Sequence, residues 1–387
     1  MQFLKSTLVG AIFLGVGVTA GWFLHQLLPS WSQEHTLLSP LQETVILPQP
    51  LKKYALARLK NYPLTPSKLT IEEELSAEKN FTSYLFTYQT MGKRMSGQIN
   101  IPSQLDKTQE PKVIVMIRGY VPPAIYSTGI GTKNAAAYFA QRGFITVAPD
   151  FFGFGTSSLE FSDEWEARLA KPIEIMELIT SIQKNGVPVD ATAFQQLPTQ
   201  KIGIWAHSNG GQIALSTLQG LGESIPTTLW APVTAPFPYS VLFFSDEEAD
   251  EGKKSRAWIA AFEKQYDVFD FSLTQHLNLL TGPLQFHHGT IDDAALIAWS
   301  DEFVDKVNGE NGRRKAASSS AMIKNSGENQ IKTTESKIAA TAAANTSILA
   351  QPIEITYFRY PGADHNLQPN WEAAVQRDVA FFGKYLK

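Results

Sequence analysis

The feature that most constrains the fold is a repeated alternation of short apolar runs with helical patterns. Apolar runs lie at 112–119 and 144–150, and residues 132–143 between them are typical of a helix that ends at Gly143. Strand, helix and strand in this order form a parallel pair, because the crossover helix returns the chain to the same end of the sheet. The alternation continues through strands expected at 202–206, 227–232, 284–289 and 353–361.

The remaining patterns complete the predicted sheet. Residues 81–90 and 94–102 alternate polar and apolar side chains around a turn at 91–93, which indicates antiparallel strands. Helices are expected at 173–184, from about residue 211, at 256–266, and after Asn370 as an N-cap. The sequence therefore predicts an α/β fold with a mostly parallel eight-stranded sheet and helices on both faces.

A candidate nucleophile follows the strand at 202–206, where the chain reads A-H-S-N-G-G (206–211) before a helix. A sharp turn between a buried strand and a helix lifts a serine hydroxyl to the carboxyl edge of the sheet, as in a nucleophile elbow. The pattern departs from G-x-S-x-G only in Ala206, and Gly210 and Gly211 let the strand and helix approach closely. A small-residue turn without chemistry is the alternative that this stretch alone leaves open.

Two further residues supply the groups that a serine nucleophile needs. A serine hydroxyl is too weak an acid to attack alone, so it requires a base and a carboxylate that orients the base. Asp292 follows the strand at 284–289 in an H-G-x-x-D pattern, and His365 follows the strand at 353–361. The order Ser208, Asp292, His365 is that of the α/β-hydrolase arrangement. We therefore predict these three residues as a catalytic triad.

The other histidines are expected to have other roles. His207 adjoins the nucleophile, and its side chain should point away. His287 and His288 belong to a strand end and are expected to pack. A metal cluster of these two with Asp292 and Asp293 is disfavoured because adjacent strand residues point to opposite faces. No metal or other cofactor is predicted.

An oxyanion hole needs two donors directed at the negative oxygen that develops in the transition state. One should be the backbone N–H of Asn209, directly after the nucleophile. The other should come from Tyr120, in the loop after the strand at 112–119, through its backbone N–H or its hydroxyl. Three phenylalanines in the glycine-rich loop 148–158 are candidates for a pocket wall: Phe151, Phe152 and Phe154.

Four motifs together resemble those of the α/β-hydrolase superfamily: A-H-S-N-G-G (206–211), H-G-T-I-D-D (288–293), Y-P-G-A-D-H (360–365) and A-P-D-x-x-G-x-G-x-S (148–157). They are most similar to the catalytic domain of the prolyl oligopeptidase (S9) serine peptidases, over residues 80–387. The resemblance implies hydrolysis of peptide bonds, including proline-containing ones, through an acyl-enzyme. The chain departs from the family in having Arg118-Gly119 where His-Gly or Gly-Gly is usual.

The resemblance leaves the substrate open. Large S9 peptidases carry a β-propeller that filters peptides, and the stretch at 29–79 is too short to form one. Similar lone catalytic domains act as carboxylesterases or dienelactone-type hydrolases on small esters, through the same acyl-enzyme mechanism. The expected partner is therefore a small peptide or ester. A non-catalytic, anchored binding module is the remaining alternative, because a fold does not fix a function.

The N-terminus departs from the globular pattern. Residues 6–24 contain no charged side chain and have the length of a membrane span. Lys5 precedes them, which favours a cytoplasmic N-terminus and an extracytoplasmic catalytic domain. We predict a membrane anchor at 1–28, with a cleaved signal peptide as the alternative. A Pro-, Ser- and Gln-rich tether or lead-in is predicted at 29–79 and the catalytic domain at 80–387.

Composition narrows the remaining function classes. The formal net charge of -4 gives no basic surface for nucleic acid, and the absence of cysteine excludes thiolate chemistry. The polar stretch 308–350 contains few large apolar residues and is expected to be a mobile insertion. The segment 236–258 is placed where such folds build a cap over the pocket, and it contains an acidic run at 246–251.

Overall fold

The computed structural model describes residues 48–190, 195–246, 249–325 and 349–387. The chain divides into two units, Met1–Pro48 and Gln49–Lys387, and the elements below belong to the second. The predicted anchor at 1–28 and the tether as far as residue 47 lie outside the described residues. In the parts of the chain that are described, no helix is both long and apolar enough to cross a membrane.

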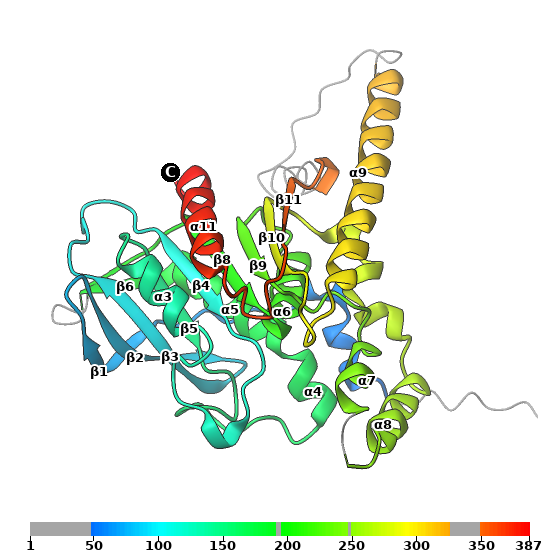
Figure 1. Cartoon of the computed structure of the whole chain (residues 1–387), viewed down its shortest axis with the longest axis horizontal. Coiled ribbons are helices and arrows are strands. Elements are labelled where there is room, and N and C mark those ends of the chain that lie inside the picture. Colours follow the sequence, from blue (N-terminus) through cyan, green and yellow to red (C-terminus); the bar gives the residue numbers. More distant parts are fainter. Residues whose placement is uncertain (1–47, 191–194, 247–248, 326–348) are drawn as a thin grey trace, which may run out of the picture. The chain divides into compact units, whose positions relative to one another are not determined.

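A nine-stranded sheet organises the second unit, in the order β1-β2-β3-β5-β4-β8-β9-β10-β11 (Figure 1). Strand β1 pairs with β2, β2 with β3, and β3 with β5, all antiparallel. The remaining neighbours in the sheet, from β5 through β4 to β11, pair in parallel. The strands are β1 (Thr70–Ala77), β2 (Phe81–Thr90), β3 (Lys93–Pro102), β4 (Val113–Ile117), β5 (Ile145–Pro149), β8 (Ile202–His207), β9 (Thr227–Trp230), β10 (Leu284–Gly289) and β11 (Ile355–Tyr360). Strands β6 (Val187–Asp190) and β7 (Gln195–Leu197) form a separate two-stranded sheet.

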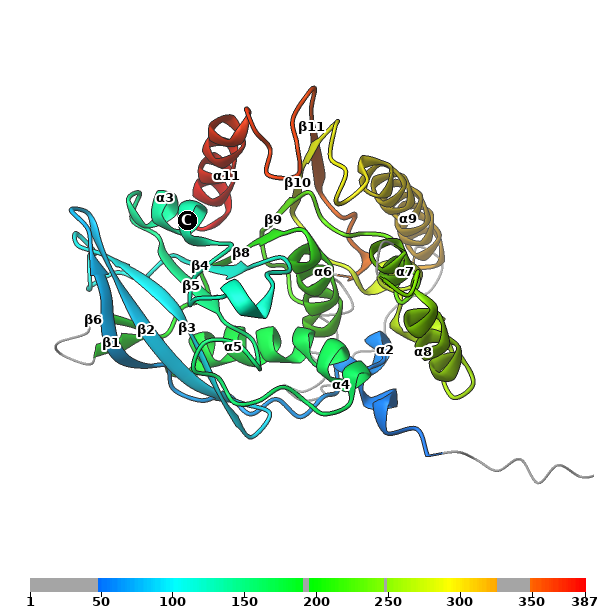
Figure 2. The ribbon, with the colours of Figure 1, turned by 60° about the horizontal axis from the view of Figure 1, so that its bottom comes forward.

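Helices cover both faces of the sheet. Helix α3 lies with α11 on one side of the strands, and α5 and α6 lie on the other (Figure 2). The α-helices are α2 (Leu56–Leu59), α3 (Lys133–Ala140), α4 (Glu164–Leu169), α5 (Lys171–Asn185), α6 (Asn209–Leu221), α7 (Ser240–Ser245), α8 (Lys253–Glu263), α9 (Ile297–Asn325) and α11 (Trp371–Tyr385). Short 3₁₀ helices are η1 (Pro50–Tyr54), η2 (Pro123–Ile125), η3 (Val268–Phe271), η4 (Leu273–Gln275) and η5 (Leu277–Leu279).

The central strands are buried on both faces, which explains their continuous apolar sequences. In β4, Val113, Val115 and Ile117 belong to the core cluster on one side of the sheet. Ile114 and Met116 belong to the cluster on the other side, with helices α3 and α11. Because side chains alternate along a strand, a strand between two helical layers needs apolar residues at every position.

The fold class predicted from the sequence is confirmed, and every strand expected from residue 81 onward is present. The sheet also contains β1, which precedes the predicted first strand and lies within the stretch expected as a tether or lead-in. This strand, with the sequence TIEEELSA, is an edge strand with mostly exposed side chains. It lacks the alternating apolar residues that identify a half-buried strand, so the sequence pattern did not reveal it.

The polar stretch expected as an insertion from residue 308 begins inside helix α9. Glu310 and Arg314 in this helix are buried and form an ion pair at 3.1 Å. Arg314 also donates to the backbone carbonyls of Leu277, Leu280 and Gln351. These bonds attach the part of α9 after residue 308, where apolar residues are rare, to the rest of the domain. Residues 326–348 of the predicted insertion lie outside the described ranges.

Helix α5 carries a buried carboxyl, Glu174, whose Oε2 has no hydrogen-bond partner within the described structure. Burial raises the pKa of this carboxyl to about 7, and Lys171 opposes the shift only in part. The folded chain therefore favours the protonated form. The protonated carboxyl contributes fully to stability below 4.5, its pKa in the unfolded chain. This contribution is lost as the pH rises through 7, its pKa in the folded chain.

We expect Glu174→Gln to be more stable than the wild type at pH 8 by about 1 to 3 kcal/mol and to show no such gain at pH 5, because the neutral amide avoids burial of a charge. Urea unfolding at both pH values measures the difference. Glu177→Gln is the matched control. The buried Glu177 carboxylate accepts hydrogen bonds from Thr65 and Met91, so this change should destabilise the chain at pH 8. A loss of stability in Glu174→Gln at pH 8 would contradict the assignment.

Candidate active site

The strained turn that carries Ser208 joins β8 to α6. Ser208 has φ 56° and ψ −125°, a combination that residues with a side chain rarely adopt. Its N–H donates to the carbonyl of Trp230 at 2.9 Å, and its carbonyl accepts from Gly211 at 2.9 Å and Val233 at 3.0 Å. These backbone bonds maintain the strained conformation and leave the side-chain hydroxyl uninvolved, as expected of a nucleophile elbow.

Two glycines after Ser208 permit the close packing of α6 against the sheet. A Cβ at Gly210 would lie 2.3 Å from the carbonyl oxygen of Ile117, and one at Gly211 would lie 2.4 Å from Cβ of Pro232. Neither position can accept a larger residue without a shift of backbone. The close approach of strand and helix therefore requires glycine at both positions, as predicted from the sequence.

Asp292 and His365, predicted as acid and base, are in contact. The Nδ1 of His365 lies 3.0 Å from Oδ1 and 2.9 Å from Oδ2 of Asp292. Since an ionised carboxylate only accepts hydrogen bonds, Nδ1 carries the proton and Nε2 of the neutral ring is free to act as a base. The His365 side chain keeps 19% exposure while Asp292 is fully enclosed, so the base remains accessible to a substrate.

Several hydrogen bonds hold the Asp292 carboxylate in its ionised form. Burial alone would raise its pKa, but bonds from His288, His365 and the Ala295 N–H outweigh burial and hold the pKa well below its usual range. The backbone N–H groups of Ala294 and Ala295 each donate to Oδ1 at 2.9 Å. The carboxylate is therefore both charged and fixed in orientation, as a group that orients a base must be.

A second imidazole, that of His288, also contacts Asp292. Its Nε2 lies 3.1 Å from Oδ2 of Asp292 and 2.8 Å from the carbonyl of Ala295, so this nitrogen faces two acceptors and carries a proton. Its Nδ1 lies 2.8 Å from the hydroxyl of Ser300 in α9. His288 therefore positions the carboxylate from behind. Its place four residues before Asp292, in H-G-x-x-D, is the sequence signal that would have found it.

The expectation that His207 points away from the site is wrong. Its Nε2 lies 3.0 Å from the carbonyl oxygen of His365, and the two ring centroids are 4.7 Å apart. Burial lowers the pKa of His207 to about 4, and the neighbouring His365 acts in the same direction. A neutral ring with its proton on Nε2 can then donate to this carbonyl and hold the His365 loop beside the nucleophile turn.

His287, by contrast, packs on the opposite side of β10 from His288, as the alternation of strand side chains requires. Its Nε2 lies 2.9 Å from the buried carboxylate of Asp378 in α11, and its Nδ1 lies 2.7 Å from the hydroxyl of Tyr360. The same carboxylate accepts from the indole of Trp230. This network joins α11 to the sheet, and among the described residues its side chains form no hydrogen bond with Ser208, Asp292 or His365.

The predicted oxyanion donors, Asn209 and Tyr120, line one cleft together with Gly119. Asn209 is the first residue of α6, where backbone N–H groups are free and the helix dipole favours negative charge. Arg118 holds the loop after β4, which carries Gly119 and Tyr120. Its buried guanidinium donates to the carbonyls of Gly119 and Asp150, each at 2.9 Å. Arg118, at a position where S9 catalytic domains usually have histidine or glycine, thus joins the predicted oxyanion loop to the loop after β5.

The structure does not bring every predicted partner into contact. Within the residues it describes, no hydrogen bond joins Oγ of Ser208 to His365. In ligand-free active sites such bonds are often long and shorten only with substrate bound. The catalytic roles of Ser208, Asp292 and His365, and of the two oxyanion donors, accordingly remain predictions supported by their placement.

Gly119 lies against the nucleophile, because a Cβ at this position would lie 2.8 Å from Cβ of Ser208. We expect Gly119→Ala to lower kcat about 100-fold, since the added methyl group must displace either the serine or the oxyanion loop, and a shift of about 1 Å can cost that much. Ester hydrolysis measured beside thermal unfolding tests this. Gly143→Ala is the control, because a Cβ there meets no atom within 4 Å, although its φ of +87° makes a loss of stability expected. Equal losses of kcat in both variants would contradict the expectation.

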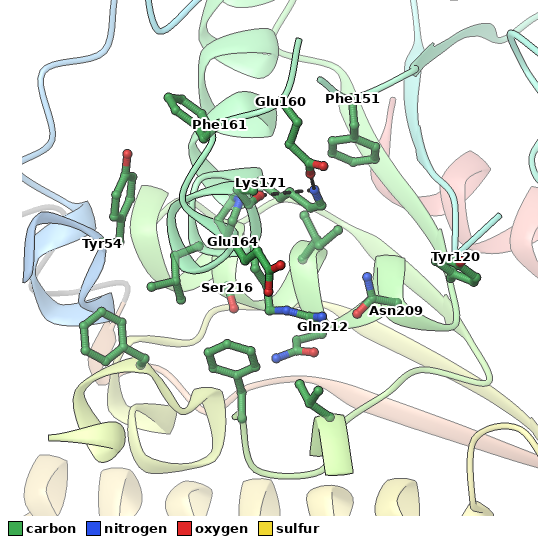
Figure 3. A pocket seen from close by; sticks show the side chains of 18 of the residues that line it. Tyr54, Tyr120, Phe151, Glu160, Phe161, Glu164, Lys171, Asn209, Gln212 and Ser216 are labelled. Atoms are coloured by element: carbon green, nitrogen blue, oxygen red, sulfur yellow. Dashed lines mark hydrogen bonds and ion pairs between the residues drawn. The ribbon is translucent and has the colours of Figure 1, made fainter. Parts of the chain in front are cut away.

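A cleft of about 520 Å³ adjoins the predicted oxyanion donors. Figure 3 shows Asn209 and Tyr120 on one side of it and Tyr54 on the other. Phe151 and Phe154 line the cleft as expected, whereas Phe152 is buried in the core. The segment predicted as a cap contributes to the wall through five residues: Phe237, Val241, Lys254, Ser255 and Trp258. Asp246, at the start of the acidic run, is paired with Arg256 at 2.6 Å.

No protein-family model matches the chain, and no curated protein matches it in sequence. Solved structures do match its fold. Acetyl xylan esterase 1 from Thermoanaerobacterium is 11% identical with a TM-score of 0.53, covering 87% of this chain and 94% of its own. An acetyl xylan esterase from Paenibacillus is 14% identical with a TM-score of 0.53, covering 85% and 92%.

A putative dipeptidyl aminopeptidase IV from Bacteroides ovatus is also similar, at 13% identity and a TM-score of 0.51. The match covers 80% of this chain but 36% of that longer protein. At such identities the comparisons establish the fold only. Together with the strand order and the elbow after β8, they show that this chain has the α/β-hydrolase fold.

Proposed function

We propose that the protein is a serine hydrolase that cleaves its substrate through an acyl-enzyme. Ser208 attacks the carbonyl carbon, His365 takes the hydroxyl proton and returns it to the leaving group, and Asp292 keeps the imidazole oriented. The backbone N–H groups of Asn209 and Tyr120 stabilise the oxyanion. Water then attacks the acyl-enzyme, with His365 again as base, and releases Ser208. The observation that carries the proposal is the bidentate contact of Asp292 with Nδ1 of His365 at the sheet edge where Ser208 is held in a strained turn.

The proposed substrates are small carboxylic esters. The cleft beside the proposed oxyanion donors is open and contains polar groups on its floor, so it can admit a short acyl or alcohol group. Support also comes from the esterases of similar fold, which match this chain over nearly their whole length. Peptide hydrolysis is the second candidate, because the sequence motifs resemble those of the S9 catalytic domains. Both reactions use the same acyl-enzyme, so the triad itself does not separate them.

Two measurements test the proposal. A fluorophosphonate probe should label Ser208, and mass spectrometry of the labelled peptide identifies the residue. A panel of short acyl 4-nitrophenyl esters beside proline- and alanine-containing peptide amides then divides esterase from peptidase. Absence of both labelling and turnover would favour the non-catalytic binding module. Turnover of amides at rates comparable to those of the esters would favour the peptidase.

We also propose that residues 1–28 anchor the protein in a membrane, with the catalytic domain on the extracytoplasmic side. The uncharged stretch at 6–24 and Lys5 before it support this proposal. The full chain should remain in the membrane fraction after a carbonate wash, and a chain that starts at residue 49 should not. Release of the full chain with a shortened N-terminus would support the signal-peptide alternative.

A further inference from the structure

The cleft beside the proposed oxyanion donors carries unpaired charge. Lys171 and Glu160 line it and neutralise each other in an ion pair at 2.9 Å, drawn as a dashed line in Figure 3. Arg168 in α4 and Lys254 in α8 also line it. In the described structure neither of these two side chains forms a hydrogen bond or an ion pair, so their positive charges face the cleft uncompensated by direct contact.

Arg168 lies beside an aromatic side chain of the cleft. Its guanidinium lies 5.8 Å from the ring centroid of Trp258, which also lines the cleft. Glu164, one helical turn earlier, lines the cleft too, but its carboxylate is not within ion-pair distance of any cation among the described residues. Glu160 and Glu164 both act on the charge of Arg168 from a distance. Four cations nevertheless line the cleft against these two carboxylates, so positive charge is in excess: Arg118, Arg168, Lys171 and Lys254. Such an excess in a concave site favours anionic ligands.

The floor of the cleft supplies neutral polar groups next to these charges. Asn209, Gln212 and Ser216 lie three and four residues apart on α6, so they share one face of the helix, and all line the cleft (Figure 3). The side-chain amides of Asn209 and Gln212 make no hydrogen bond within the described part of the chain. Polar groups that converge on a pocket without protein partners are those that fix the orientation of a ligand.

We propose that this cleft binds a carboxylate group of the substrate, with Arg168 as its principal partner. The proposal rests on the proposed function, since it names the substrate class of the same site: esters that carry a second, anionic group. A guanidinium presents paired N–H donors that match the two oxygens of a carboxylate, and such charge-assisted bonds are about twice as strong as neutral ones. Lys254 in α8 adds a second positive charge to the lining, and the amide of Gln212 is a further donor.

Matched esters test the proposal, because the members of each pair differ in one terminal group, which is a carboxylate in the anionic member. One pair carries it on the acyl side, 4-nitrophenyl hexanoate and the 4-nitrophenyl monoester of adipate. The other pair carries it on the alcohol side, phenyl acetate and 4-carboxyphenyl acetate. We expect the wild-type chain at pH 7.5 to prefer the anionic member of at least one pair about tenfold in kcat/KM, mainly through KM. The preference should fall as salt is added, since exposed charges are screened.

Arg168→Gln should abolish this preference, Arg168→Lys should retain part of it, and Glu164→Gln should increase it by removing a repulsive charge. Arg142→Gln is the control for net charge. Arg142 is exposed in the turn after α3, donates to the carbonyl of Tyr138 and does not line the cleft, so this variant should keep the preference. The proposal is overturned if Arg168→Gln changes the anionic and neutral esters by the same factor in both pairs.

Binding without turnover separates this proposal from the hydrolase proposal. Adipate should bind to the Ser208→Ala chain in calorimetry more tightly than hexanamide, and the added change Arg168→Gln should remove the difference. If labelling and turnover fail but adipate still binds through Arg168, the hydrolase proposal is wrong and the anion site stands. If turnover of neutral esters succeeds and adipate does not bind, the anion site is wrong and the hydrolase proposal stands.

Discussion

Replacing Ser208 by alanine should lower kcat for ester hydrolysis about a million-fold, which is close to 8 kcal/mol of transition-state stabilisation. The nucleophile acts as one unit with His365 and Asp292, so its removal leaves only substrate binding and the oxyanion donors. The measurement is the initial rate on the best ester of the panel, together with labelling by the fluorophosphonate probe. Labelling should be absent.

The fold of the Ser208→Ala chain should remain intact, which makes the loss of activity interpretable. The backbone bonds that hold the turn use the N–H and carbonyl of Ser208, and alanine retains both as well as the Cβ. The unfolding midpoint in urea should therefore match that of the wild type. Ser216→Ala is the matched control, because this serine lies on α6, which begins directly after Ser208, and lines the cleft beside the predicted oxyanion donors; its rate should stay within about tenfold. A Ser208→Ala chain that retains ester turnover would show that another group attacks the substrate.

The parts of this molecule that could be predicted from the sequence are those with a strong local signal. Apolar runs marked the parallel strands because burial on both faces demands them, as in β4. The small residues around Ser208 marked the elbow because a close approach of helix and strand demands them. The contact of Asp292 with His365 followed from their places after parallel strands, whose carboxyl ends meet at one edge of the sheet.

The parts that escaped prediction depend on neighbours that are distant in the sequence. The edge strand β1 has exposed side chains and pairs through its backbone, which leaves no apolar pattern to detect. Helix α9 continues through a polar sequence because Arg314 finds acceptors in residues 34 to 37 positions away. His207 contacts the carbonyl of His365, which is 158 positions later in the chain. No residue near His207 in the sequence indicates that contact.

Asp292→Asn should lower kcat about 10,000-fold by placing the wrong tautomer on His365. In the wild-type chain the carboxylate accepts from Nδ1 and leaves Nε2 free as a base. The backbone N–H groups of Ala294 and Ala295 would continue to select an oxygen at the Oδ1 position, so the new amide nitrogen would occupy the Oδ2 position. An amide there donates to Nδ1, and the proton of His365 moves to Nε2, which can no longer accept one from Ser208.

The same geometry predicts a cost in stability that the rate alone would not reveal. The Oδ2 position of Asp292 also faces Nε2–H of His288, so an amide nitrogen there would place two donors 3.1 Å apart in a buried site. We expect the free energy of unfolding to fall by about 1 to 3 kcal/mol at pH 7. Asp293→Asn is the matched control, because this neighbouring carboxylate is exposed, and both its rate and its stability should stay near wild type. Should Asp293→Asn, and not Asp292→Asn, abolish turnover, the acid of the triad would be Asp293 and the contact with His365 would be structural only.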